Sequence, residues 1–237
     1  MKNKKNILIF LIIFILILLI ILYIIYTLMN ASNSKAINFY TVGGNKENGL
    51  VISDNENDAE KGIEYETIKN LKGNQFVWVP VENVMANSYD EAVEMVKNGK
   101  YPLVVKDGEN YKTLMYYFNG KEKKITLSHT EFDITEEPQS GNSDEQERFN
   151  SMVKYLIKYN GFYISRFEIG NITNLQNGED NKAVSKYGQN HIVENTWNNM
   201  FSICKNMYQY ENAKTEMMWG CKWNAILIWF YSNENTR

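Results

Sequence analysis

The sequence predicts an α+β protein of mixed short strands and amphipathic helices, preceded by one transmembrane helix. Three observations support this prediction. An uncharged apolar stretch covers 7–29, short β-branched and aromatic runs such as 75–81 are separated by polar turns, and apolar residues recur at helical spacing after residue 143. The 237 residues are enough for one domain with a sizeable core or for two small domains.

The N-terminal stretch Ile7–Met29 contains 23 residues without a charge, a Gly or a Pro. At about 1.5 Å per residue, a helix of this length crosses a hydrocarbon core of about 30 Å. Lysines stand before it at positions 2, 4 and 5, so the positive-inside rule predicts a cytoplasmic basic tail over 1–6 and an exported remainder. We therefore expect a single-pass protein of the cell membrane, with a cytoplasmic N-terminus and an extracellular C-terminal domain.

Two other interpretations of this stretch fit less well. A cleavable signal peptide has an apolar core of about 7 to 15 residues and a small-x-small cleavage site. The stretch is longer than that, and 29–31 and 32–34 offer only weak sites. A type IV prepilin leader would place a Gly before the processing site and a Glu just inside the apolar stretch, and both are missing.

The rest of the chain is acidic and polar. Three of the 25 basic residues precede the apolar stretch, so 22 basic residues stand against 28 acidic ones, a net charge of −6. A nucleic-acid binder needs clustered Lys and Arg to neutralise phosphates, so nucleic acid is not an expected partner. The abundance of Lys, Asn and Ile indicates a bacterial source with an AT-rich genome.

The region 30–48 is rich in Asn, Ser and Gly and is predicted to form a flexible stalk. An ectodomain is expected over 49–237, and its first strands are predicted at 49–52 and 75–81. The acidic loop 54–58 between these strands lacks the later Gly and Glu of an EF-hand, so calcium is not expected there.

Helices and strands then follow each other. A capping box at 88–91 opens a helix that ends at Gly99. The further elements expected are strands at 102–106, 112–118 and 124–134, a helix capped by Ser143, a strand at 162–169, a polar loop over 171–190, a helix from Asn195 or Thr196, and a helix over 217–231. The last helix is expected to be buried on two sides, because aromatic residues occur all along it.

One strand carries a conceivable metal triad. His129, Glu131 and Asp133 fall on the same side of the strand predicted at 124–134. Polar residues at alternate positions are also typical of the solvent-facing side of an antiparallel strand, which is the preferred interpretation. No metal ligand is therefore assigned.

The two cysteines, Cys204 and Cys221, leave two interpretations open. Outside the cytoplasm they could form a disulfide that closes a loop of seventeen residues and contributes about 3 kcal/mol. Alternatively, each is a free thiol on the apolar side of a helix. His191 is separated from both by a predicted helix, so neither a catalytic thiolate pair nor a zinc site is expected.

No catalytic signature is found in the sequence. It contains no glycine-rich phosphate loop, no G-x-S-x-G, no H-E-x-x-H and no pair of C-x-x-C motifs. Arg166 and Glu168 would share one side of the strand at 162–169, where a structural ion pair is expected before a catalytic one. No catalytic, cofactor-binding or metal-binding residue is assigned, and no cofactor is expected.

Four segments, taken in order, resemble the N-terminal half of the formylglycine-generating enzyme (sulfatase-modifying factor) family. They are 74–81 (NQFVWVPV), 161–170 (GFYISRFEIG), 196–204 (TWNNMFSIC) and 218–225 (MWGCKWNA). The matching positions are Phe162, Ile164, Arg166 and Glu168 in the second segment, Trp197 and Cys204 in the third, and Trp223 and Ala225 in the fourth. The resemblance implies a C-type-lectin-like fold with an insertion at about 82–160.

The chain also departs from this family. The segment 218–222 replaces the family's L-P-T-E-A-E, and the family's later segments, including the cysteine pair used for copper-dependent oxidation, have no counterpart before Arg237. Cys204 and Cys221 therefore inherit no catalytic role. The resemblance implies a partial domain whose C-terminal half is missing, so that some aromatic residues of the last helix are left uncovered.

Two functional hypotheses follow. In the first, this is a membrane-anchored extracellular protein, held by Ile7–Met29, whose truncated domain is non-catalytic and binds a surface glycan or a protein through exposed Tyr and Trp. In the alternative, the chain is half of a split or fragmented formylglycine-generating-type oxidase that a separate chain completes.

Overall fold

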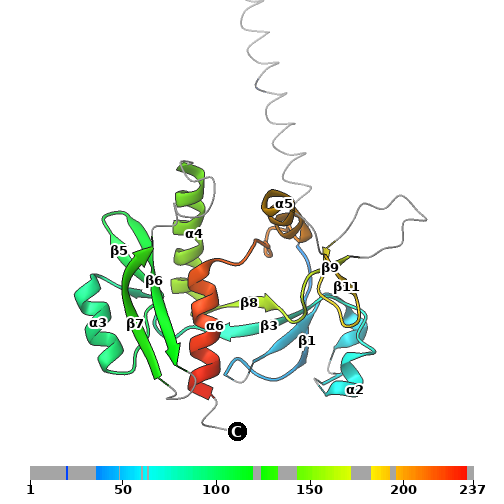
Figure 1. The fold of residues 1–237 in the computed structure, drawn as a ribbon. Helices are drawn as coiled ribbons and strands as arrows, with labels where there is room; N and C mark the ends of the chain where they lie inside the picture. The colour runs from blue at the N-terminus through cyan, green and yellow to red at the C-terminus, as the bar shows by residue number, and fades with distance from the viewer. Residues whose placement is uncertain are drawn as a thin grey trace, which may run out of the picture.

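The computed structural model describes residue 20 and residues 36–47, 49–59, 61–62, 64–119, 124–132, 143–171, 183–192 and 196–233. Within these residues the chain is α+β, with five α-helices, one short 3-10 helix and three small sheets. Figure 1 shows helix α6 in the middle, with strands β5 to β7 and helix α3 on one side and strands β3 and β8 on the other.

The first sheet has the antiparallel order β1-β2-β3-β8. Its strands are β1 (Tyr40–Gly43), β2 (Val51–Ser53), β3 (Gln75–Pro80) and β8 (Gly161–Ser165), and the short helices η1 (Glu56–Asp58) and α2 (Tyr65–Ile68) lie between β2 and β3. The β-branched and aromatic residues of 75–81 predicted β3 correctly. Phe76 and Val79 of β3 are buried on opposite faces, so the sheet is covered on both sides.

The second sheet has the order β4-β5-β6-β7 and comes entirely from the middle of the chain. Its strands are β4 (Met85–Ala86), β5 (Val104–Asp107), β6 (Asn110–Asn119) and β7 (Lys124–Phe132), with helix α3 (Tyr89–Lys97) packed against β4 and β7. The strands predicted at 102–106, 112–118 and 124–134 correspond to β5, β6 and β7.

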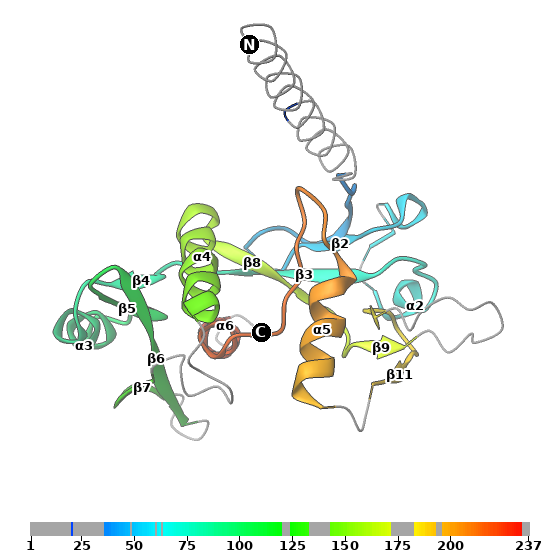
Figure 2. The same ribbon diagram turned by 90° about the horizontal axis from the view of Figure 1, so that it is seen from above.

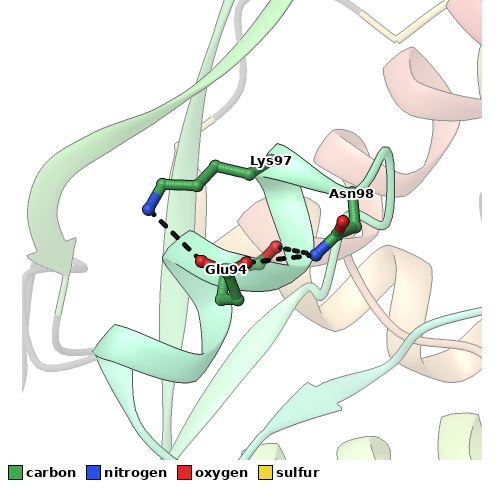
Figure 3. Close-up of polar contacts among 3 residues, drawn as sticks. All are labelled: Glu94, Lys97 and Asn98. Atoms are coloured by element: carbon green, nitrogen blue, oxygen red, sulfur yellow. Dashed lines mark hydrogen bonds and ion pairs between the residues drawn. The ribbon is translucent and has the colours of Figure 1, made fainter.

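Helix α3 begins and ends where local side-chain chemistry predicts. At its start, Ser88 Oγ accepts a hydrogen bond from Glu91 N at 3.1 Å, as expected of a capping box. At its end, Lys97 Nζ lies 3.2 Å from a Glu94 carboxylate oxygen, and Asn98 Nδ2 donates to the Glu94 carbonyl at 2.9 Å (Figure 3). The Glu94 carbonyl thus accepts from both the backbone N–H and the side-chain amide of Asn98, which fixes the last turn of the helix.

The remaining elements complete the domain. They are helix α4 (Ser143–Tyr159), the strands β9 (Gly170–Asn171), β10 (Ala183–Val184) and β11 (Asn190–His191) of a small sheet ordered β10-β9-β11, helix α5 (Trp197–Met207) and helix α6 (Gly220–Asn233). Thr196 caps α5 by accepting from Asn199 N at 3.3 Å. Asn160, with a φ of 53°, follows α4 and turns the chain directly into β8.

Residues 82–160, which the resemblance predicts to be an insertion, supply much of the central hydrophobic core. The fully buried α4 side chains Phe149 and Val153 share one cluster with Val79 of β3, Phe162 of β8 and Ile226 of α6. A second cluster lies between α3 and the second sheet. Helix α6 joins the two clusters, because Ile228 packs against both.

The prediction of a single-pass membrane protein is corrected by this structure. No helix in the described part of the chain is long and apolar enough to cross a membrane. The transmembrane helix predicted at Ile7–Met29 and the basic tail at 1–6 lie outside the described residues, except for residue 20. The membrane anchor and the extracellular location therefore have no support in the structure.

The C-type-lectin-like fold is wrong as a description of this architecture. Its strands are divided among three separate small sheets, and the central core depends on residues 82–160. The four resembling segments are real elements, since they contain β3, β8, α5 and the start of α6. Each motif reflects local strand or helix chemistry that different folds share, so the motifs together did not determine the arrangement.

Three local details differ from the sequence predictions. The region 30–48 is expected to be a stalk, yet Tyr40–Gly43 forms β1, where buried Val42 adds apolar contact to a polar segment. The strand predicted at 162–169 ends at Ser165. Of the aromatic residues on the last helix, Trp223 and Phe230 are 53% and 51% exposed, so α6 is less covered than expected.

A buried amide links α6 to the second sheet. Leu114 N donates to Leu103 O at 3.0 Å, but Leu103 N donates to Val84 O at 2.9 Å. The Leu114 carbonyl therefore lacks the reciprocal bond of an antiparallel pair. Asn224 Nδ2 of α6 donates to this carbonyl at 2.8 Å, and the Asn224 side chain is buried.

Replacing this amide should destabilise the protein. Asn224→Ala leaves the buried Leu114 carbonyl without its partner, and we expect the free energy of unfolding to fall by about 1–3 kcal/mol. Urea denaturation of the full chain, followed by tryptophan fluorescence, measures the change. The control is Asn198→Ala on the exposed side of α5, which should shift stability by less than about 0.5 kcal/mol. Equal stability of Asn224→Ala and the unchanged chain would contradict the assigned role.

Candidate functional site

A groove with a cavity volume of about 740 Å³ lies between strand β8 and the segment that joins α5 to α6. One wall is the unbroken run 162–169, which comprises most of β8 and the residues that follow it. The other wall is formed by 212–218 and Lys222 at the start of α6. In Figure 2 the segment between α5 and α6 passes β8 on its way to the centre of the molecule.

The floor of the groove is a cluster of packed aromatic rings. The ring centroids of Phe39, Phe76 and Tyr208 lie 5.7 to 6.0 Å apart, each pair in an edge-to-face arrangement. Ile52 of β2 and Met207 of α5 extend this apolar surface. The floor is therefore built from the first sheet and the end of α5, which are held together by one hydrophobic cluster.

Hydrogen bonds fix the orientation of Tyr208. Its hydroxyl donates to the Asp54 carboxylate and accepts from Asn74 Nδ2 at 2.8 Å. Burial, followed by the bond to Asp54, raises the pKa of the Tyr208 phenol well above its usual value. The phenol therefore stays protonated and acts as a structural donor.

Charged groups occur at the sides of the groove. Arg166 Nη1 donates to Gln75 Oε1 at 3.0 Å, and burial lowers the pKa of the guanidinium from its usual value. Lys222 Nζ lies 2.7 Å from Glu216 Oε1 and 5.3 Å from the centroid of the Phe162 ring. Because each of these cations has a partner within the chain, the groove presents a mainly apolar surface.

The two cysteines differ in their surroundings. Both are free thiols. Cys204 is half-buried and lines the groove, and burial raises the pKa of its thiol. Cys221 is fully buried in the central core, where burial raises its pKa to about 12. A raised pKa disfavours the thiolate, so neither environment activates a nucleophile.

The other sequence candidates lie in two places, the groove and strand β7. Arg166 and Glu168 both line the groove, but β8 ends before them, and Arg166 is directed to Gln75. His129 and Glu131 belong to β7, although their side chains and the whole of Asp133 lie outside the described part. The described residues contain no group of three His, Cys, Asp or Glu side chains able to hold a metal ion.

Several groove residues had no signal in the sequence. Tyr163 of β8, Tyr208 and Met217 belong to elements that the sequence predicts, but nothing in their spacing indicates a shared cavity. Their proximity depends on pairing between β3 and β8, which are far apart in the sequence. A strand of this kind could be recognised from its alternation, whereas its position in the sheet could not.

Comparison with known proteins adds no further information. No protein-family model, no curated protein and no solved structure matches this chain. The resemblance to the formylglycine-generating enzyme family therefore stays a prediction.

The thiol environments predict a defined order of alkylation. Because the thiolate is the reactive form and burial raises the pKa of Cys204, its iodoacetamide rate should reach half of its maximum at a higher pH in the native protein than after unfolding. Cys221 should react only after unfolding. Rates measured on Cys204→Ala and Cys221→Ala separate the two thiols, with urea-unfolded protein as the control. A native Cys204 midpoint at or below that of the unfolded protein would contradict the assigned environment.

Proposed function

We propose that this chain is a non-catalytic binding protein whose groove between β8 and the α5–α6 segment holds part of a partner protein. The observation that supports this most directly is the groove itself, at about 740 Å³, with an aromatic floor and walls from two separate elements. Sites of this size and apolar character are typical of ligand recognition.

The side chains around the groove favour binding over catalysis. The half-buried Cys204 thiol has a raised pKa, and the Tyr208 phenol is held protonated by burial and by Asp54. Catalytic nucleophiles and bases need pKa values close to the working pH. The surroundings of Cys204 and Tyr208 raise the pKa values of both groups and so move them further from neutral pH. The polar groups of the groove are therefore suited to structural roles.

The lining also favours a polypeptide over a glycan. A glycan presents many hydroxyl groups, which need several unengaged polar partners when they are desolvated. Here the Arg166, Lys222 and Tyr208 side chains already bond within the chain. Phe39, Tyr163 and Met217, by contrast, keep exposed apolar surface that can contact apolar side chains.

Cys204 provides a direct test because it lines the groove. Peptides selected from a random displayed library on the immobilised full chain should slow the alkylation of Cys204 when bound. Tyr163→Ala, which removes a 40% exposed ring from the groove wall, should weaken the selected peptides about fivefold or more. Fluorescence anisotropy of labelled peptides measures the affinity.

The matched control is Tyr117→Ala, because Tyr117 is a 66% exposed strand tyrosine on β6, away from the groove. Its affinity for the selected peptides should equal that of the unchanged chain. The proposal fails if bound peptides leave the Cys204 rate unchanged, or if the two variants weaken binding equally. If a glycan from an array binds and protects Cys204 while no peptide binds, the proposed partner class, a polypeptide, is wrong.

A further inference from the structure

The groove follows the outer edge of strand β8. In the order β1-β2-β3-β8, β8 is the terminal strand of the sheet within the described part of the chain. The groove lining includes the successive β8 residues 162–165, whose side chains point alternately to the two faces of the sheet. The groove is lined by β8 side chains from both faces of the sheet, so it extends around the outer edge of the strand. The backbone of β8 therefore borders the groove.

The hydrogen bonds of the sheet show which backbone groups point outward. Arg166 N donates to Gln75 O at 2.9 Å, and Val81 N donates to Asn160 O at 2.9 Å. Antiparallel pairs alternate between hydrogen-bonded and non-hydrogen-bonded, so Phe162 and Ile164 also bond toward β3.

The alternate residues, Tyr163 and Ser165, therefore direct their N–H and C=O groups away from β3 and toward the groove. The β3 partner of Tyr163 confirms this alternation. Trp78 pairs with Tyr163, and Trp78 N donates to Leu50 O at 2.8 Å, on the opposite side of β3.

This edge lacks the devices that usually protect a terminal strand. Sheet edges are commonly blunted by Pro, by charged side chains or by bulges. The β8 sequence GFYIS contains no Pro and no charge, and its register with β3 runs without a shift from Gly161 to Ser165. A regular edge of five residues, about 17 Å long, is therefore available for pairing.

The surroundings of the edge decide what can pair with it. The segment 212–218 stands opposite β8 as the second wall of the groove. A whole sheet from a second copy of the chain would meet this wall, whereas a single extended segment needs only the groove between the walls. Backbone N–H and C=O groups in alternation are complementary to another extended polypeptide backbone.

We infer that the partner segment adds to β8 as a further strand, hydrogen-bonded to the backbone of Tyr163 and Ser165. This inference rests on the proposed binding function and specifies its mode. Side chains on one side of the added strand meet the partly exposed ring of Phe39, and those on the other side meet the partly exposed Ile164 and Met217. The partner is therefore an extended segment with apolar residues on both of its faces.

The first experiment examines backbone protection in the full chain by hydrogen–deuterium exchange at single-residue resolution. Without a ligand, the amides of Tyr163 and Ser165 should exchange faster than those of Ile164 and Arg166. Saturation with a peptide selected from the random library should slow exchange at Tyr163 and Ser165. Peptides that protect Cys204 from alkylation but leave these two amides unchanged would overturn strand addition while keeping groove binding intact.

The second experiment scans the selected peptide with single N-methyl groups. Strand addition predicts that methylation at every second position weakens binding about fivefold or more, because each such position loses a hydrogen bond, while the positions between are tolerated. A uniform effect along the peptide would overturn the inference. The scan changes only the peptide, so the fold of the protein cannot confuse the result.

The third experiment changes the strand itself. Ser165→Pro removes an outward N–H and leaves the bonds of Ile164 and Arg166 to β3 in place. It should weaken the peptide about fivefold or more, with an unchanged circular dichroism spectrum. Unchanged affinity of the folded variant would count against strand addition, and the peptide scan decides the matter if the variant does not fold.

Discussion

The structure depends on helix α6, which packs against both the first and the second sheet. Its sequence is apolar on most sides, so it packs through more than one of them, although Trp223 and Phe230 stay about half exposed. Ile228 packs against both the central cluster and the cluster of the second sheet, and the Asn224 amide bonds to β6. The second sheet and the first sheet are therefore held in one body by the last helix of the described chain.

The position of α6 also explains why a groove exists. Helix α5 packs with the cluster formed by Ile52, Phe76 and Met207, whereas α6 packs with Val79 and Phe162 on the other face of the same sheet. The chain between them has to pass around the edge of β8. A hairpin stiffens this passage, since Thr215 N donates to Tyr208 O at 3.1 Å and Tyr210 N to Ala213 O at 2.9 Å.

Local signals predicted the elements better than the architecture. The capping residue Ser88 and the start of α5 at Asn195 or Thr196 follow from side-chain chemistry within a few residues, and the structure confirms the first and selects Thr196 for the second. Strand β1 was not predicted because it is stabilised by pairing with β2, and the composition of 30–48 carries no information about that pairing. The C-type-lectin-like fold was wrong because similar local motifs occur in different packing arrangements, and only long-range contacts distinguish them.

The candidate site was the least predictable part, for the same reason. Tyr163 and Ser165 are ordinary strand residues, and they border a groove only because β8 pairs with β3 on one side alone within the described chain. Cys204 and Arg166 were noticed for their chemistry, but the structure gives them surroundings that reduce reactivity. The useful property of the site is an arrangement of backbone and apolar surface, which residue motifs do not encode.

Polar bonds beneath the groove indicate that it is formed before any partner arrives. The buried Asp58 carboxylate accepts from Lys72 N at 2.9 Å, from Gly73 N at 2.7 Å and from Ser53 Oγ at 2.7 Å, which holds the chain just before β3. Gly73 is required there, since a Cβ would lie 2.1 Å from Ser53 Oγ.

Asn74 extends this network in two directions. Its side chain donates to the Tyr208 hydroxyl in the floor of the groove, and it accepts from Ser185 N in the segment that follows β10. A floor held by buried hydrogen bonds loses little conformational freedom on binding, so more of the contact free energy is available for affinity. The partner segment, rather than the groove, then bears most of the ordering cost. Affinity should therefore depend on how readily that segment becomes extended.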